Sequence, residues 1–171
     1  MKLKTFGERS LSTLLFYALR AITIGYIIFF ILIVLAIVTK SFEIVNNEFI
    51  IKIPFTDSVI KGNYETKVFL AITIFLIFYT VFFYLASNIF KTFKSKVLFT
   101  KKASRYLLYF TFWNLLYAVT ELVIIGILYQ RMSITETPEW MLHLILGIFS
   151  WFIASIFKEG TQIQQENELT I

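Results

Sequence analysis

Apolar residues gather into four long runs that are separated by polar segments. The first run, Ala21 to Thr39, has nineteen residues without a charge, and the second, Val68 to Phe90, has twenty-three. The third, Tyr106 to Gln130, carries a single charged residue, and the fourth extends from Trp140 to Phe157. Nineteen helical residues reach about 28 Å, which matches a bilayer hydrocarbon core of about 30 Å. Each run is therefore long enough to cross a membrane once.

The spans should be helices, because an open sheet would leave backbone groups unpaired in lipid. Residues 10–20 are apolar enough to extend the first helix, with Arg20 reaching towards the lipid headgroups. Thr137 and Pro138 suit the N-cap and the first position of the fourth helix. We predict an all-α membrane protein, a four-transmembrane-helix bundle that forms a single membrane domain over residues 1–171. The predicted spans cover about 11–39, 68–90, 106–130 and 138–158.

Three polar segments connect or follow these spans. The largest is an outer loop, residues 40–67, in which two short β-prone stretches flank Asn46 and Asn47 and predict a hairpin. A two-stranded hairpin alone is marginal in water, so it should rest on the helix ends or on a partner. The other two segments are a basic loop, residues 91–105, and a polar tail, residues 159–171.

Composition supports the membrane assignment and removes several kinds of chemistry. Of the 171 residues, 58% are apolar and 16% are charged. Soluble domains average roughly 45 to 50% apolar residues and about 25% charged residues. A soluble fold of this length cannot hide four such runs from water. The chain has no cysteine and one histidine, which excludes disulfides, thiolate metal sites and a histidine-built zinc site. We therefore expect no cofactor and no metal.

The distribution of Lys and Arg predicts the orientation. Eleven of these residues lie in the N-terminal segment, the loop between spans two and three, and the tail, whereas five lie on the opposite side. Cytoplasmic segments carry the excess of positive charge, and acidic residues contribute little to topology. We expect both termini in the cytoplasm.

Glu121 is the one charged residue inside the four apolar runs. Thr111, Asn114, Ala118 and Glu121 follow helical spacings of three, four and three, so they form one polar and small stripe that should face other helices. His143 lies at a similar level at the outer start of span four and is the predicted partner of Glu121. This membrane-interior polar site (Asn114, Glu121, His143) is either a structural hydrogen bond or a proton or substrate relay, and Glu121 can be neutral or ionised.

The loop between spans two and three is strongly basic and contains no acidic residue. Such a loop sets topology and attracts anionic lipids, so membrane lipids are expected partners. No recognised nucleic-acid-binding module accompanies the charge, and we expect no direct nucleic acid binding. The residues predicted to contact anionic lipid are Lys91, Lys94, Lys96, Lys101, Lys102 and Arg105.

Enzyme motifs are missing from the sequence. It contains no G-x-G-x-x-G, no G-x-x-x-x-G-K-[ST], no H-E-x-x-H and no G-x-S-x-G. The acid within a span and the histidine have no nucleophile pattern near them. We expect a protein that is not an enzyme, with no catalytic residue.

The C-terminal segment carries a resemblance to a known family. The apolar pair Ile156-Phe157 is followed by the polar run from Lys158 to Ile171, and this segment resembles the C-terminal signature of the YoaS-like family. That family comprises small bacterial integral-membrane proteins of unknown function with four predicted spans. The step Leu98-Phe99-Thr100, followed by Leu107-Leu108, is similar to the family's entry into span three. Leu98 and Ile163 depart from the proline and leucine that are usual in the family at these positions.

The resemblance implies a bacterial cytoplasmic (inner) membrane protein that is encoded beside a very small helix-turn-helix regulator. A membrane protein of this kind would hold or control a cytoplasmic DNA-binding partner. The tail offers hydrogen-bonding groups, an acidic balance and two terminal apolar anchors for such a partner. The alternative is that the tail caps span four and folds against the basic loop. The predicted partner-binding residues are Gln164, Gln165, Glu166, Asn167, Glu168, Leu169 and Ile171.

Two classes of function therefore stay open. The first is a non-enzymatic membrane regulator, or membrane anchor, for a small helix-turn-helix transcription regulator. The second is a small transporter or channel that uses the polar stripe around Glu121. Four helices leave little room for a solute path within one chain, so the second class requires a homo-oligomer.

Overall fold

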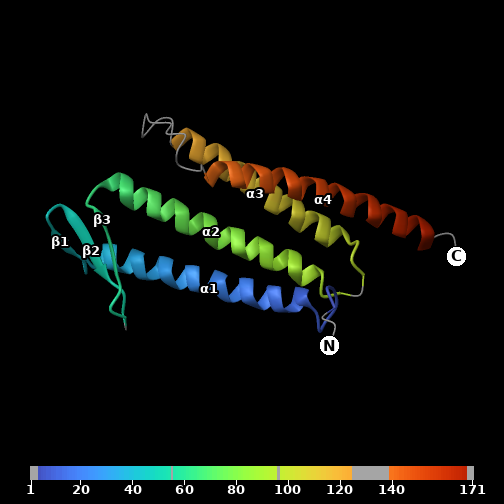
Figure 1. Cartoon of the computed structure of the whole chain (residues 1–171), viewed down its shortest axis with the longest axis horizontal. Coiled ribbons are helices and arrows are strands. Elements are labelled where there is room, and N and C mark those ends of the chain that lie inside the picture. The colour runs from blue at the N-terminus through green and yellow to red at the C-terminus, as the bar shows by residue number, and fades with distance from the viewer. Residues whose placement is uncertain (1–3, 55, 96, 125–138, 169–171) are drawn as a thin grey trace. The chain divides into compact units, whose positions relative to one another are not determined.

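The computed structural model describes residues 4–54, 56–95, 97–124 and 139–168 of the chain. Four long helices, α1 (Leu11–Val38), α2 (Thr66–Thr92), α3 (Lys101–Ile124) and α4 (Glu139–Glu168), are each long and apolar enough to cross a membrane. A three-stranded sheet lies between α1 and α2 in the sequence (Figure 1). The prediction of an all-α membrane protein with a β-prone loop is confirmed, and the chain is a multi-pass membrane protein.

The described residues group into two compact units. One contains Met1–Arg20 with Phe82–Ile171, and the other is Ala21–Val81. α1 and α2 each contribute one part to both units, because the units divide within these helices. A single membrane domain for the whole chain stays a prediction.

The ends of α1 show why the helix stops where it does. At its start, the amides of Leu11 and Ser12 donate to the carbonyls of Lys4 and Thr5, at 2.9 and 3.2 Å, which pairs donors that a helix N-terminus leaves open. At its end, Ser41 N donates to Ala36 O, and Lys40 adopts a positive φ of 52°. This is a Schellman termination, in which a left-handed residue closes the last turn.

α3 begins five residues earlier than the predicted span, at Lys101 instead of Tyr106. The cause is Thr100, whose Oγ1 accepts a hydrogen bond from Ala103 N at 3.1 Å. A threonine N-cap satisfies one of the open amides of the first turn and fixes the start of the helix. Three basic residues of the predicted loop therefore belong to α3: Lys101, Lys102 and Arg105.

The predicted hairpin is present and is part of a larger sheet. β1 (Glu43–Val45) and β2 (Glu48–Lys52) pair antiparallel around Asn46 and Asn47, which both have positive φ and form the two-residue turn. A third strand, β3 (Val59–Asn63), pairs with the other edge of β2 and was not predicted. Its sequence, VIKGN, carries a weak strand signal because it contains lysine, glycine and asparagine.

The sheet rests on an apolar core in its own unit, as a small sheet requires for stability. Phe49 is fully buried, and its register partner in β3 is Gly62. A Cβ at Gly62 would lie 3.1 Å from the Phe49 ring, so the absence of a side chain there lets the ring pack across β3. We call this group the sheet core; it consists of Ala36, Phe42, Phe49, Ile51, Ile60, Val68, Phe69 and Ile72.

Candidate functional site

α3 and α4 pack along a line of small and polar side chains, which we call the α3–α4 seam (Ser104, Thr111, Asn114 and Ala118 with His143, Gly147, Ser150 and Ala154). Thr111 Oγ1 and Ser150 Oγ lie 2.9 Å apart and are hydrogen-bonded, and both residues are buried. Nearer the start of α3, Ser104 Oγ donates to Ala154 O at 3.1 Å. Figure 1 shows the two helices running alongside each other. The stripe of α3 residues therefore faces α4 through Thr111, Asn114 and Ala118.

Asn114 and His143 meet within this seam. Asn114 Oδ1 lies 2.8 Å from His143 Nδ1, and Asn114 Nδ2 donates to Phe110 O at 2.7 Å. Asn114 has 0% of its surface exposed, so both ends of its amide find partners away from solvent. The rings of Phe82 and Tyr117 contact the imidazole edge-on, with centroid separations of 5.7 and 4.6 Å. The histidine is thereby fixed in position and orientation.

Close approach of the two helices depends on Gly147. A Cβ at this position would lie 2.8 Å from Leu115 Cδ2 and 2.9 Å from Leu115 Cγ, so any side chain would displace either Leu115 or the helix. Small residues at helix contacts have this role in membranes. The α4 half of the seam was not predicted, although the sequence contains the signal: His143, Gly147, Ser150 and Ala154 follow spacings of four, three and four.

Glu121 lies at the end of the stripe, and its partnership with His143 stays a prediction. The Nδ1 atom of His143 is paired with Asn114. Glu121 Oε2 is buried and has no hydrogen-bond partner among residues 4–54, 56–95, 97–124 and 139–168. Asn114, two turns nearer the start of α3, is the residue of the stripe that meets this nitrogen. Whether Glu121 serves a relay stays a prediction.

The predicted tail is not a separate segment, because α4 continues through it to Glu168. This extends the helix by ten residues beyond the predicted end of span four, 158. Glutamine and glutamate are good helix formers, and Gln162 Nε2 donates to Glu166 Oε1 one turn away at 3.0 Å. Of the predicted partner-binding residues, Leu169, Ile171 and the side chain of Glu168 lie outside the described part of the chain.

The α4 extension, residues 159–168, has one packed face and one open face. On the packed face, Thr161 is buried, and a Cβ at Gly160 would lie 2.5 Å from the Phe99 ring. The same side of α4 places the Phe157 ring against the rings of Phe93 and Phe99. The open face includes Glu166 and Ile163, which is 59% exposed, and the polar residues Gln165 and Asn167 are exposed beside it.

The basic residues near the α2–α3 connection are spread over helix ends. Lys91 lies in the last turn of α2, where a cation is favourable, but Lys101 and Lys102 begin α3, where a helix N-terminus disfavours positive charge. These two lysines therefore do not stabilise their own helix electrostatically. Lys94 lies in the connection, and Lys96 is outside the described residues. Their predicted contact with anionic lipid remains a prediction.

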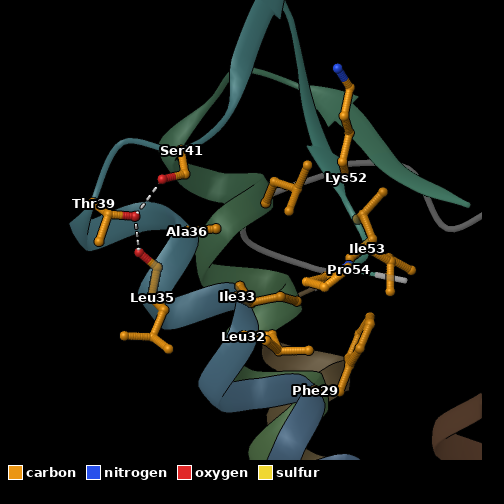
Figure 2. Close-up of a pocket in the computed structure, with 12 residues that line it drawn as sticks. Phe29, Leu32, Ile33, Leu35, Ala36, Thr39, Ser41, Lys52, Ile53 and Pro54 are labelled. Atoms are coloured by element: carbon orange, nitrogen blue, oxygen red, sulfur yellow. Dashed lines mark hydrogen bonds between the residues drawn. The ribbon is translucent and has the colours of Figure 1, made fainter. Parts of the chain in front are cut away.

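A mainly apolar groove of about 210 Å³ lies between α1 and the sheet, within the second unit. Its floor is formed by α1 residues including Phe29, Leu32 and Ile33, and β2 and the segment after it contribute its other wall. Figure 2 shows polar groups at one end, where Thr39 Oγ1 is hydrogen-bonded to Ser41 Oγ at 2.7 Å. The groove was not predicted, because no sequence motif marks it.

The four long apolar helices and the polar seam define the class: a four-span integral membrane protein. The family described as "Protein of unknown function (DUF2975)" matches residues 42–171. The chain belongs to this family. No curated protein and no solved structure matches the chain.

Proposed function

We propose that this protein is a non-enzymatic membrane regulator that holds a small cytoplasmic helix-turn-helix transcription regulator on its α4 extension. The observation that supports this proposal most directly is the continuation of α4 as a polar helix for ten residues beyond the apolar span. In the proposed topology both termini lie in the cytoplasm of a bacterium and the spans cross its inner membrane. The resemblance to the YoaS-like family supplies the partner class.

The two faces of the extension suit a docking element. Gly160 lies against the Phe99 ring in the connection after α2, so the exposed residues of the extension are held in place. Fixing a binding element before the partner arrives reduces the ordering cost of association. Ile163 provides an exposed apolar anchor, and neighbouring amide and carboxylate groups provide polar contacts. This is the usual composition of an interface, apolar at its centre and polar at its rim.

The charge balance favours a basic partner surface. The extension contains Glu159, Glu166 and Glu168 and no Lys or Arg after Lys158. A DNA-binding regulator carries a positive surface, and complementary potentials guide such a partner onto the extension. Contact with the extension would occupy the surface that the regulator needs for DNA.

The transporter alternative has less support from the geometry. The α3–α4 seam is filled by the hydrogen bonds Thr111–Ser150 and Asn114–His143 and by the close contact at Gly147. A solute path along the stripe would have to break these contacts. The alternative predicts that Glu121→Gln abolishes transport of some solute while the protein still folds.

Capture of the regulator tests the proposal. The helix-turn-helix protein encoded beside this gene would be co-purified with the full chain and with a chain truncated after Gly160. Truncation removes no residue of the seam, so insertion and folding should be preserved while capture is lost. Glu166→Lys should weaken capture more at low salt than at high salt, because exposed charges are screened beyond about 8 to 10 Å near physiological ionic strength.

Glu139→Lys is the matched control, since it makes the same charge change at the opposite end of the same helix. It should leave capture unchanged. Equal recovery with the full and truncated chains, and unchanged output of the regulator's promoter, would reject the extension as the docking element. It would then be a structural cap that packs α4 against the α2–α3 connection.

A further inference from the structure

Two cations, Arg20 of α1 and Lys94 after α2, meet at one aromatic ring. Lys94 Nζ lies 4.8 Å from the centroids of both Phe16 and Tyr17, and Arg20 Cζ lies 5.6 Å from the centroid of Phe16. Arg20 also lies 4.8 Å from the ring of Tyr84. All of these residues belong to the first unit. The cations are held by aromatic faces, which attract positive charge without neutralising it.

No carboxylate of the described residues pairs with these two charges. Within the described part of the chain, neither Arg20 nor Lys94 forms an ion pair with an acidic residue. The guanidinium donates one hydrogen bond, to Asn88 Oδ1 at 3.0 Å, although it has five N–H groups. Several strong donors therefore lack an acceptor among the described residues.

Asn88 positions the guanidinium. Its side chain is 3% exposed, and its Nδ2 has no hydrogen-bond partner among the described residues. Leaving a buried amide donor unpaired costs free energy, so this orientation indicates that the bond from Arg20 to Oδ1 outweighs that cost. Arg20 is thus preorganised on α2 instead of moving freely over the membrane surface.

The level of Arg20 along α1 identifies the surroundings of the site. Arg20 immediately precedes Ala21–Thr39, the nineteen-residue uncharged run that matches the thickness of the hydrocarbon core. The guanidinium consequently lies at the boundary between hydrocarbon and headgroups. Tyr17 and Tyr84 are both exposed beside it, and tyrosine is enriched at this boundary.

We propose that Arg20 and Lys94, with Asn88 as the positioning residue, bind the phosphate of an anionic phospholipid from the surrounding leaflet. A guanidinium matches two phosphate oxygens at once, and the ammonium supplies a second positive charge. A zwitterionic headgroup carries its own cation and gains less from two uncompensated positive charges. The phospholipid's acyl chains lie where the apolar residues of α1 meet lipid, which a free phosphate ion cannot exploit.

The test compares phospholipid retention by the full chain in detergent. Phosphatidylglycerol, phosphatidylcholine or inorganic phosphate would be added, and bound lipid counted by native mass spectrometry alongside the unfolding temperature. We expect phosphatidylglycerol to be retained and to raise that temperature, with a much smaller effect of the other two. Lys94→Gln and Arg20→Lys should each weaken phosphatidylglycerol binding about tenfold, because each removes charge-assisted hydrogen bonds.

Arg105→Gln is the matched control, since it removes one exposed positive charge from the start of α3. Arg105 is expected to attract anionic lipid only diffusely, so this substitution should weaken phosphatidylglycerol binding far less than tenfold. Equal weakening by all three substitutions would show diffuse attraction and overturn the proposal, as would unchanged binding in Lys94→Gln. Inorganic phosphate that binds as tightly as phosphatidylglycerol would also overturn it, since the site would then serve a free anion. Lys94 follows the end of α2, so its substitution tests the site even if Arg20 variants do not fold.

Discussion

The α3–α4 seam and the sheet core are both buried, but they are built from opposite kinds of side chain. The seam consists of serine, threonine, asparagine and histidine, joined by hydrogen bonds, with glycine and alanine between them. The sheet core consists of phenylalanine, isoleucine, valine and alanine, and the ring centroids of Phe49 and Phe69 lie 4.7 Å apart. Each composition fits a different solvent. Lipid offers no hydrophobic force between helices, whereas a sheet in water depends on burying apolar surface.

The largest effect should come from opening the sheet core. Phe49→Ala removes a fully buried ring and should destabilise the sheet by about 3 to 5 kcal/mol, which includes the cost of the cavity. Hydrogen exchange should then show loss of protection in β2 and β3, while amides of α3 and α4 keep theirs. Ile44→Ala is the control, because Ile44 is 52% exposed and should change little. Unchanged exchange in β2 of Phe49→Ala would show that the sheet does not depend on this core.

A smaller effect is expected where the seam is closest. Gly147→Ala places a methyl group against Leu115 and should cost about 1 to 3 kcal/mol through overpacking. Gly25→Ala makes the same change in α1 at a position where a Cβ meets no atom within 4 Å. That control should be neutral or stabilising, since alanine is the better helix former. Thermal unfolding in detergent distinguishes the two, and equal effects would contradict the role given to Gly147.

The sequence predicts the helices better than the contacts between them. Length and hydropathy fix the four spans because the bilayer imposes a single thickness on every span. The stripe on α3 was recognisable because Thr111, Asn114 and Ala118 interrupt an apolar pattern. The pairing of Asn114 with His143 was not recognisable from the sequence. The position of α4 along α3 depends on tertiary packing, which helical periodicity alone does not specify.

Local signals explain the remaining differences. Thr100 marks the start of α3 as an N-cap, whereas the apolar run that predicts the span begins later, at Tyr106. β3 was not predicted because a glycine such as Gly62 weakens the sequence signal for a strand. In the structure, the absence of a side chain at Gly62 leaves space for the Phe49 ring. The site at Arg20 has no sequence motif, since Phe16, Tyr84 and Lys94 come together only through packing of α1 with α2 in the first unit.

A double-mutant cycle on the seam measures its polar contribution directly. The variants Asn114→Ala, His143→Ala and the double variant should show a coupling energy of about 0.6 kcal/mol, and at most about 1.7, as for hydrogen bonds between membrane helices. The Thr111–Ser150 pair offers a second cycle at the next contact along the seam. A coupling near zero in both cycles would mean that close packing, and not hydrogen bonding, holds α3 against α4.

The smallest effect is expected at the surface of the sheet, where Lys52 Nζ lies 2.9 Å from Glu43 Oε1 and both side chains are largely exposed. The hydrogen bond and the charge of Glu43 raise the pKa of Lys52 above its ordinary value of 10.5. A raised lysine pKa means that the pair stabilises the fold below pH 10.5 and that this contribution is lost as the pH rises through the folded-state pKa.

Glu43→Gln should therefore lower the Lys52 pKa, which NMR of the Nζ group can measure. The unfolding temperature at pH 7 should not change measurably, because exposed pairs contribute little. Adding salt to the wild type should shift the titration in the same direction. An identical Lys52 titration in the wild type and Glu43→Gln would show that the ion pair does not form in solution. A large loss of stability at pH 7 would contradict the small contribution expected of an exposed pair.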